Sequence, residues 1–174
     1  MSEFQWVSDS EQLSLKVEEW LEKPFIALDT EFERTNTFFA KPGLLQVADG
    51  DSVTLSDPLA VSDWERVAPV LTSLDTVVVI HSMSEDVELL QNVAGVYPER
   101  VFDTQIAAGF LGYRYPISFR KLVETELGWH LKKGYAVADW EARPFQQRQL
   151  TYALEDVLPL YNLWQKASGR LKKY

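Results

Sequence analysis

The stretch Phe25-Ile26-Ala27-Leu28-Asp29-Thr30-Glu31-Phe32 decides the fold. Its first four residues are apolar without interruption, which predicts a central strand covered on both faces. Asp29 and Glu31 follow that strand at positions i and i+2, so an extended chain points them to the same side. Adjacent carboxylates repel unless a cation lies between them, and hard oxygen ligands suit Mg²⁺ or Mn²⁺. The alternative is a solvated turn after the strand.

Strands and helices alternate on either side of this stretch. The apolar and β-branched runs predict strands over residues 4–7, 25–28, 43–48, 52–55, 76–80 and 101–102. Helical spacing and capping residues predict helices over residues 10–21, 63–74, 84–93, 104–111, 118–127 and 145–166. Asp49-Gly50 is a strong hairpin signal, so the first strands of the sheet are antiparallel. We therefore predict an α/β domain spanning residues 1–174, with a mixed sheet and helices on both faces.

Composition excludes several classes of site. The 174 residues include no cysteine, which excludes disulfides and thiolate zinc sites and is compatible with the cytoplasm. No apolar run approaches the ~20 residues of a membrane span, so no membrane association is expected. The net charge of −9 opposes polyanion binding, but residues 110–150 hold seven basic and four acidic residues. A basic flank of this kind can still hold a nucleic acid.

Three further residues carry chemistry at defined positions. Asp86 lies at the start of the helix after the 76–80 strand, where α/β active sites gather, although an acid is also favourable at any helix N-terminus. Tyr152 and Asp156 are spaced i and i+4 on the last helix and share a face. An Asp among packed apolar residues needs a partner, which is either the tyrosine hydroxyl or a cation. Together with the strand carboxylates they form a set that can hold two divalent ions at a phosphodiester.

The chain resembles the DEDD superfamily of 3'-5' exonucleases, and specifically the ribonuclease D catalytic domain. The motifs are FIALDTEFERTNTFFAKPGLLQVADG at Phe25–Gly50, VVVIHSMSEDVELL at Val77–Leu90, VFDTQIAAGFLG at Val101–Gly112, and ADWEARPFQQRQLTYALEDVLPLY at Ala138–Tyr161. The resemblance covers almost the whole chain. It implies a ribonuclease H-like fold and hydrolysis from the 3' end of RNA or DNA, with release of nucleoside 5'-monophosphates.

The same resemblance implies roles for individual residues. The four carboxylates that would bind two Mg²⁺ or Mn²⁺ ions are Asp29, Glu31, Asp86 and Asp156. Tyr152 places the chain in the tyrosine-type branch, where this residue positions the attacking water. The implied substrate contacts are Thr30, Phe32, Gln105 and Arg143. For the last three, a core phenylalanine, a surface polar group and a salt bridge are the alternatives.

His81 and Asp86 also have the spacing of the histidine-type branch. That assignment would leave no carboxylate between Glu31 and His81 and no use for Tyr152 and Asp156. We therefore predict that His81 packs or forms hydrogen bonds at its strand end.

Two other functions fit the residues less well. A non-catalytic nucleic-acid or protein-binding module predicts a broken carboxylate set, whereas all four are present. A phosphatase with Asp29 as nucleophile usually carries a second Asp two residues on, whereas this chain has Glu31. The expected partner is a single-stranded 3' end, with no protein partner, and the helical RNA-binding domains that follow the family's catalytic domain are not expected within these 174 residues.

Overall fold

The computed structural model describes residues 4–34, 37–131 and 138–171. A six-stranded sheet has the order β1-β4-β3-β2-β5-β6. Its strands are β1 (Gln5–Val7), β2 (Phe25–Glu33), β3 (Lys41–Ala48), β4 (Val53–Ser56), β5 (Val77–Ile80) and β6 (Val101–Asp103). The β2, β3 and β4 strands pair antiparallel in the order β2-β3-β4. The parallel pairs are β1 with β4, β5 with β2, and β6 with β5. The predicted mixed sheet is confirmed.

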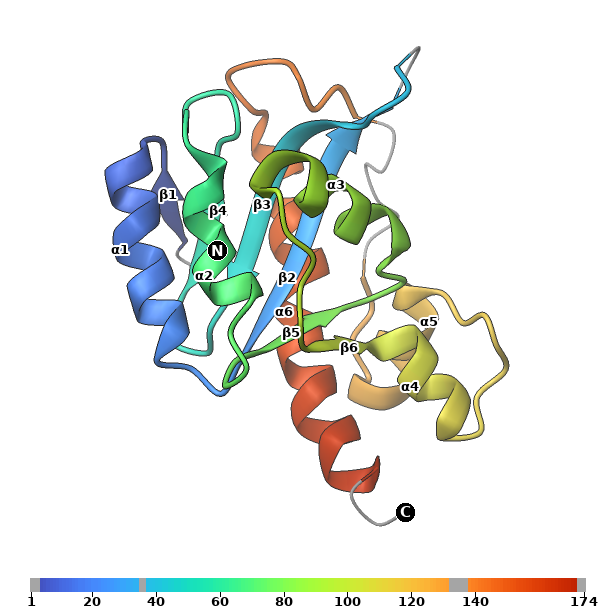
Figure 1. Cartoon of the computed structure of the whole chain (residues 1–174). Helices are drawn as coiled ribbons and strands as arrows, with labels where there is room; N and C mark the ends of the chain where they lie inside the picture. The colour runs from blue at the N-terminus through green and yellow to red at the C-terminus, as the bar shows by residue number, and fades with distance from the viewer. Residues whose placement is uncertain (1–3, 35–36, 132–137, 172–174) are drawn as a thin grey trace.

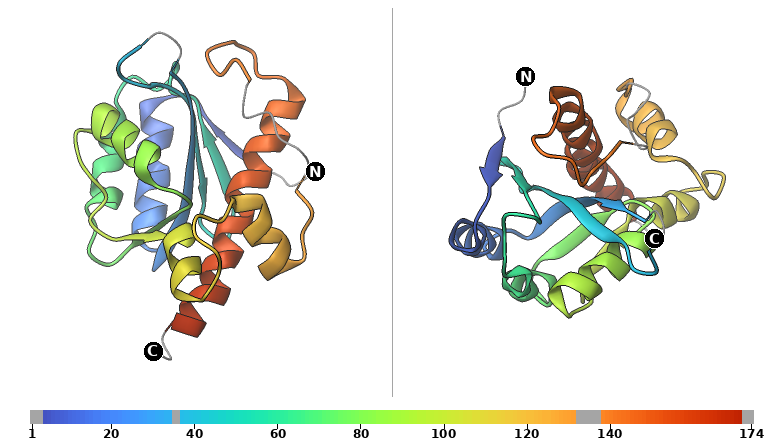
Figure 2. Two further views of the ribbon diagram at one scale, coloured as in Figure 1. Left: turned by 90° about the vertical axis from the view of Figure 1, so that its right-hand side faces the viewer. Right: turned by 90° about the horizontal axis from the view of Figure 1, so that it is seen from above.

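Helices cover both faces of the sheet (Figure 2). The helical segments are α1 (Ser10–Leu21), η1 (Trp64–Val67), α2 (Ala68–Leu71), α3 (Ser84–Ala94), α4 (Thr104–Phe110), α5 (Phe119–Leu127) and α6 (Gln147–Leu171). One core joins α1, α2 and α3 to the sheet through residues such as Trp20, Ile26 and Leu90. A second core joins the opposite face to α6 through residues such as Leu44 and Val157. The long α6 helix crosses behind β2 (Figure 1).

The central strand is longer than the sequence predicts. β2 extends over Phe25–Glu33, so Asp29 and Glu31 lie within the strand and not after it. The antiparallel partner β3 continues the ladder past the apolar run, with Asp29 opposite Gln46 and Glu31 opposite Leu44. Backbone pairing therefore overrides the low strand preference of the acids. The alternation of a strand directs residues 25, 27, 29 and 31 toward α6.

The predicted hairpin turn at Asp49-Gly50 is confirmed. The Asp49 carboxylate accepts the backbone N–H groups of Asp51 at 2.9 Å and Ser52 at 2.7 Å. Gly50 has a φ of +96°, a conformation that L side chains rarely adopt. This turn sets the register of β3 against β4.

One predicted helix is wrong in length and type. Residues 63–74 were expected to form a single helix, but the chain forms the 3₁₀ segment η1 and then the single turn α2. Pro69 follows η1 at the start of α2 and lacks the N–H that would continue one regular hydrogen-bond ladder. Over the residues that the structure describes, no helix is both long and apolar enough to cross a membrane.

Candidate active site

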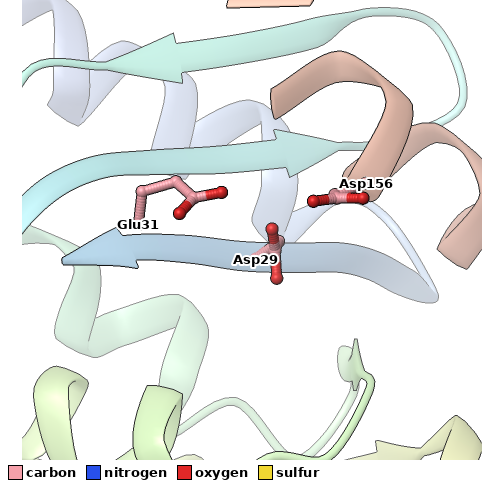
Figure 3. A group of neighbouring side chains, drawn as sticks. All are labelled: Asp29, Glu31 and Asp156. Carbon is pink, nitrogen blue, oxygen red and sulfur yellow. The ribbon is translucent and has the colours of Figure 1, made fainter. Parts of the chain in front are cut away.

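Three carboxylates meet between the sheet and the last helix (Figure 3). Asp29 and Glu31 project from the same face of β2, and Asp156 reaches toward them from α6. One oxygen from each of the three lies within 4.8 Å of the others, and all three side chains are partly buried. The shared strand face and the packing of α6 over it thus bring together residues far apart in the sequence.

Asp86 approaches the strand from its other face. It lies in the first turn of α3 and is 7% exposed. The Thr30 hydroxyl, which the alternation of β2 directs toward α3, donates a hydrogen bond of 2.5 Å to the Asp86 carboxylate. The charge of Asp86 acts on both Asp29 and Glu31, so it belongs to the same electrostatic group. Thr30 therefore fixes this acid at the site.

The turn that leads into α3 is held by Asp103 at the end of β6. Its carboxylate accepts the backbone N–H groups of Ser82 at 3.1 Å and Met83 at 3.0 Å. The same carboxylate caps α4 by accepting the N–H groups of Gln105 and Ile106. Ser82 has a φ of 60°, an uncommon conformation for a residue with a side chain. Asp103 thus stabilises a strained turn that sets the start of α3 and so the position of Asp86.

The acids of this site hold protons more tightly than ordinary acids. Burial, and then the charges of Asp86, Glu31 and Asp156, raise the pKa of Asp29 well above its usual range. Burial, and then Asp156 and Asp86, raise the pKa of Glu31 to about 9. Burial raises the pKa of Asp86 and of Asp156 to about 6 each. A positive charge at this position would offset both the cost of burying the ionised acids and the repulsion between them.

These residues fit a divalent cation. The donor set consists of carboxylate oxygens, the ligands that Mg²⁺ and Mn²⁺ prefer. Three of the donors already converge from two elements, and burial and mutual repulsion raise the pKa of Asp29 and of Glu31, which a bound cation would offset. A buried cluster of acids without a counterion is costly, which argues against a solvated turn at this position.

Tyr152 lies one helical turn before Asp156 on α6. Its phenol donates a hydrogen bond to the Asp156 carboxylate. Burial, followed by the charge of Asp156, raises the pKa of the Tyr152 phenol. The phenol therefore stays protonated and acts as a hydrogen-bond donor, which suits orientation of a substrate or water better than removal of a proton.

A packed tryptophan supports the tyrosine. The ring centroids of Trp140 and Tyr152 are 6.2 Å apart, and Trp140 is 1% exposed. Trp140 lies so close to β3 that a Cβ added at Gly43 would stand 2.5 Å from the Trp140 Cβ atom. Only glycine allows this approach at that position.

The other predicted substrate contacts are engaged within the protein. The Gln105 side chain donates to the Ile117 carbonyl at 3.0 Å. Arg143 forms a salt bridge with Asp57 at 2.6 Å and lies 3.8 Å above the ring of Phe145. The salt-bridge alternative for Arg143 is thus observed, and substrate contact by either residue stays a prediction. Phe32 is partly buried beside a register shift between Glu31 and Phe32.

His81 behaves as predicted at the end of β5. Its Nδ1 atom lies 2.8 Å from the Thr104 hydroxyl, and its ring lies 5.1 Å from that of Phe119. Burial lowers the pKa of the His81 imidazole. The prediction that this histidine packs and forms a hydrogen bond is confirmed.

Residues that the sequence analysis missed include Arg120 and Gln46. The positive charge of Arg120, in the first turn of α5, opposes the raised pKa of Asp156. Gln46 lies opposite Asp29 on β3. The signal for Gln46 was present in the sequence as a single polar residue within the apolar run Leu44-Leu45-Gln46-Val47.

Fold and site together define a class: an α/β protein with a mixed sheet and a carboxylate cluster, drawn from a central strand and the last helix, that suits a metal ion. A family model described as a 3'-5' exonuclease matches residues 4–172. The chain therefore belongs to the 3'-5' exonuclease family. Exonucleases of the DEDD type are metal-dependent, and the carboxylate cluster that this requires is present.

Individual relatives agree with that assignment. The chain is similar to ribonuclease D of Shewanella sp. (strain ANA-3), with 40% identity over 99% of this chain and 44% of the relative. It is 38% identical to ribonuclease D of Escherichia coli (strain K12) over 88% of this chain and 41% of the relative. The chain thus spans less than half the length of these curated relatives.

Solved structures show the same likeness. Escherichia coli RNase D superposes with a TM-score of 0.94 and 36% identity, over 98% of this chain and 46% of that chain. The catalytic core of RRP6 from Trypanosoma brucei gives a TM-score of 0.91 and 28% identity, over 99% of this chain and 48% of that chain. The ribonuclease D-like fold predicted from the motifs is confirmed.

Proposed function

We propose that this chain removes nucleotides one at a time from the 3' end of single-stranded RNA and releases nucleoside 5'-monophosphates. The observation that carries the proposal is the convergence of Asp29, Glu31 and Asp156 within 4.8 Å. The similarity to Escherichia coli RNase D, described as an exoribonuclease involved in structured RNA processing, favours RNA over DNA.

The proposed metal ligands are Asp29, Glu31, Asp86 and Asp156, which would hold two Mg²⁺ or Mn²⁺ ions. Such ions supply positive charge for the attacking and leaving oxygens of the phosphodiester. The hydrogen bond from Thr30 orients Asp86, and packing of α6 on β2 orients Asp156 against Asp29. The proton affinities of these acids support the proposal, because cation binding would displace the protons.

Protein side chains near the cluster have proposed roles in the hydrolysis. Water attacks phosphorus, the bond from phosphorus to the 3' oxygen breaks, and the leaving 3' oxygen takes up a proton. The protonated Tyr152 phenol donates its O–H to Asp156 and orients the water by accepting a hydrogen bond from it. Phe32 follows Glu31 on β2 and offers a ring on which the terminal base stacks. The cytoplasm and a single-domain organisation stay expectations from the sequence.

The test is a cleavage assay with 5'-labelled single-stranded RNA and a DNA oligonucleotide of matched sequence. Each is incubated with Mg²⁺, Mn²⁺ or EDTA, for the wild type and for Asp156→Asn as the matched control. A ladder that shortens from the 3' end with metal, and is lost in EDTA and in the variant, supports the proposal. Intact substrates under all conditions would favour the non-catalytic binding module instead. Faster cleavage of DNA would correct the substrate class.

A further inference from the structure

Gln46 is a buried polar side chain whose hydrogen-bonding groups lack partners. The residue is 0% exposed in the middle of β3. Neither its amide nitrogen nor its carbonyl oxygen forms a hydrogen bond with any part of the chain that the structure describes. An amide buried in this way costs roughly 1–3 kcal/mol by protein mutational data. A leucine or methionine of similar size would avoid that cost, so stability alone does not account for a glutamine here.

The position of Gln46 supplies a reason for it. Gln46 lies directly opposite Asp29 in the antiparallel pairing of β2 with β3. Directly opposite residues share a face of the sheet, and their Cβ atoms are typically about 4.5–5.5 Å apart. The alternate neighbours on β3, Leu44 and Ala48, belong to the core under α6, which places Gln46 on the face of the carboxylate cluster.

The β4 partner of Gln46 and the fully buried α6 residues of this core offer its amide no side-chain hydrogen-bonding group. Leu55, its partner on β4, is apolar and fully buried. The fully buried α6 residues of this core, Ala153, Val157 and Leu160, are also apolar. Asp29 is thus the polar side chain that the strand pairing brings next to the amide.

We propose that Gln46 is a positioning residue, whose side-chain N–H donates a hydrogen bond to the Asp29 carboxylate when the site holds its cation. This inference rests on the proposed metal site. A hydrogen bond to an ionised carboxylate is about twice as strong as one between neutral groups. The contact between Gln46 and Asp29 is either direct or bridged by one buried water. It would hold one carboxylate oxygen and leave the other directed at the cation. Loss of a residue that hydrogen-bonds to a metal ligand typically weakens metal affinity about 10–100-fold.

The test compares Mn²⁺ binding by calorimetry in wild type, Gln46→Met and a matched control, Thr54→Val. Thr54 is also 0% exposed with an unpartnered hydroxyl among the described residues, but it pairs with Val47 and belongs to the opposite face. Gln46→Met should weaken Mn²⁺ binding about 10–100-fold, without loss of thermal stability in EDTA. Thr54→Val should leave Mn²⁺ affinity unchanged.

A second measurement uses only the wild-type protein, so it does not depend on whether a variant folds. In ¹⁵N-labelled wild-type protein, diamagnetic Mg²⁺ should shift the Gln46 side-chain amide proton downfield, because its new acceptor is charged. Equal Mn²⁺ affinity in Gln46→Met and wild type, or an unmoved amide signal, would overturn the inference while leaving the proposed function intact. A wild-type protein that binds neither cation would overturn both.

Discussion

Replacement of Glu31 by glutamine tests the electrostatics of the carboxylate cluster without removing volume. In the metal-free protein, burial, Asp156 and Asp86 raise the pKa of Glu31 from 4.5 to about 9. At neutral pH the folded chain therefore keeps a proton on Glu31 that the unfolded chain releases. Between the unfolded pKa of 4.5 and neutral pH lie about 2.5 pH units, over which the bound proton destabilises the folded state by about 3 kcal/mol. Glutamine does not ionise, so the Glu31→Gln protein does not lose this free energy of folding.

The expected gain depends on pH in a defined direction. Because the raised pKa belongs to an acid, wild-type stability is largest below the unfolded pKa and falls as the pH rises toward 9. Partial exposure of Glu31 reduces this energetic cost through solvent screening. The free energy of unfolding of Glu31→Gln should therefore exceed that of wild type by about 1–3 kcal/mol at pH 7 and by less than about 1 kcal/mol at pH 5. The measurement is urea unfolding in EDTA at both pH values.

The control for this experiment is Glu22→Gln, which changes an exposed glutamate after α1 and should have little effect at either pH. Addition of Mn²⁺ should reverse the order, because wild type gains ligand-linked stability that Glu31→Gln largely loses. A Glu31→Gln protein that is less stable in EDTA, or whose gain is the same at both pH values, would refute this account of the cluster.

Three other substitutions test separate parts of the structure. Tyr152→Phe removes the phenol that we propose orients the water, so single-turnover cleavage should slow about 10²-fold or more while Mn²⁺ affinity measured by calorimetry stays close to wild type. Gly43→Ala brings a Cβ to 2.5 Å from the Trp140 Cβ atom, and urea unfolding should show a loss of about 1–3 kcal/mol; a neutral result would mean that β3 and Trp140 separate easily. Asp103→Ala leaves four backbone N–H groups without their acceptor and should lose about 2–4 kcal/mol in the same assay, and an unchanged unfolding midpoint would contradict its role at the two helix starts.

Local chemistry predicted most of the fold. The Asp49-Gly50 turn and the helices capped by Asp103 and Ser118 follow from residues close in sequence, and the structure has them. The end of β2 was misplaced because strand length depends on a partner, here β3, that lies elsewhere in the chain. Residues 63–74 have apolar residues at helical spacing, but Pro69 interrupts the hydrogen-bond ladder that a single helix requires.

The site was predictable to a different degree. Asp29, Glu31 and Asp156 were selected from the sequence, and the structure brings them together. The hydrogen bond from Thr30 to Asp86 could not be predicted, because it depends on how α3 packs against the opposite face of β2. Gln46 was missed for the same reason, since its importance comes from register and not from its own neighbours in sequence.

The last helix closes the site, and this has a consequence for the order of assembly. Asp156 comes from α6, while Asp29 and Glu31 come from the second strand of the chain. A ribosome releases β2 long before α6, and domains form from the N-terminal side as synthesis proceeds. The growing chain therefore carries an incomplete set of the proposed metal ligands until α6 docks on the sheet. The proposed metal site is thus complete only when α6 has docked on the folded sheet, and a partly synthesised chain lacks it.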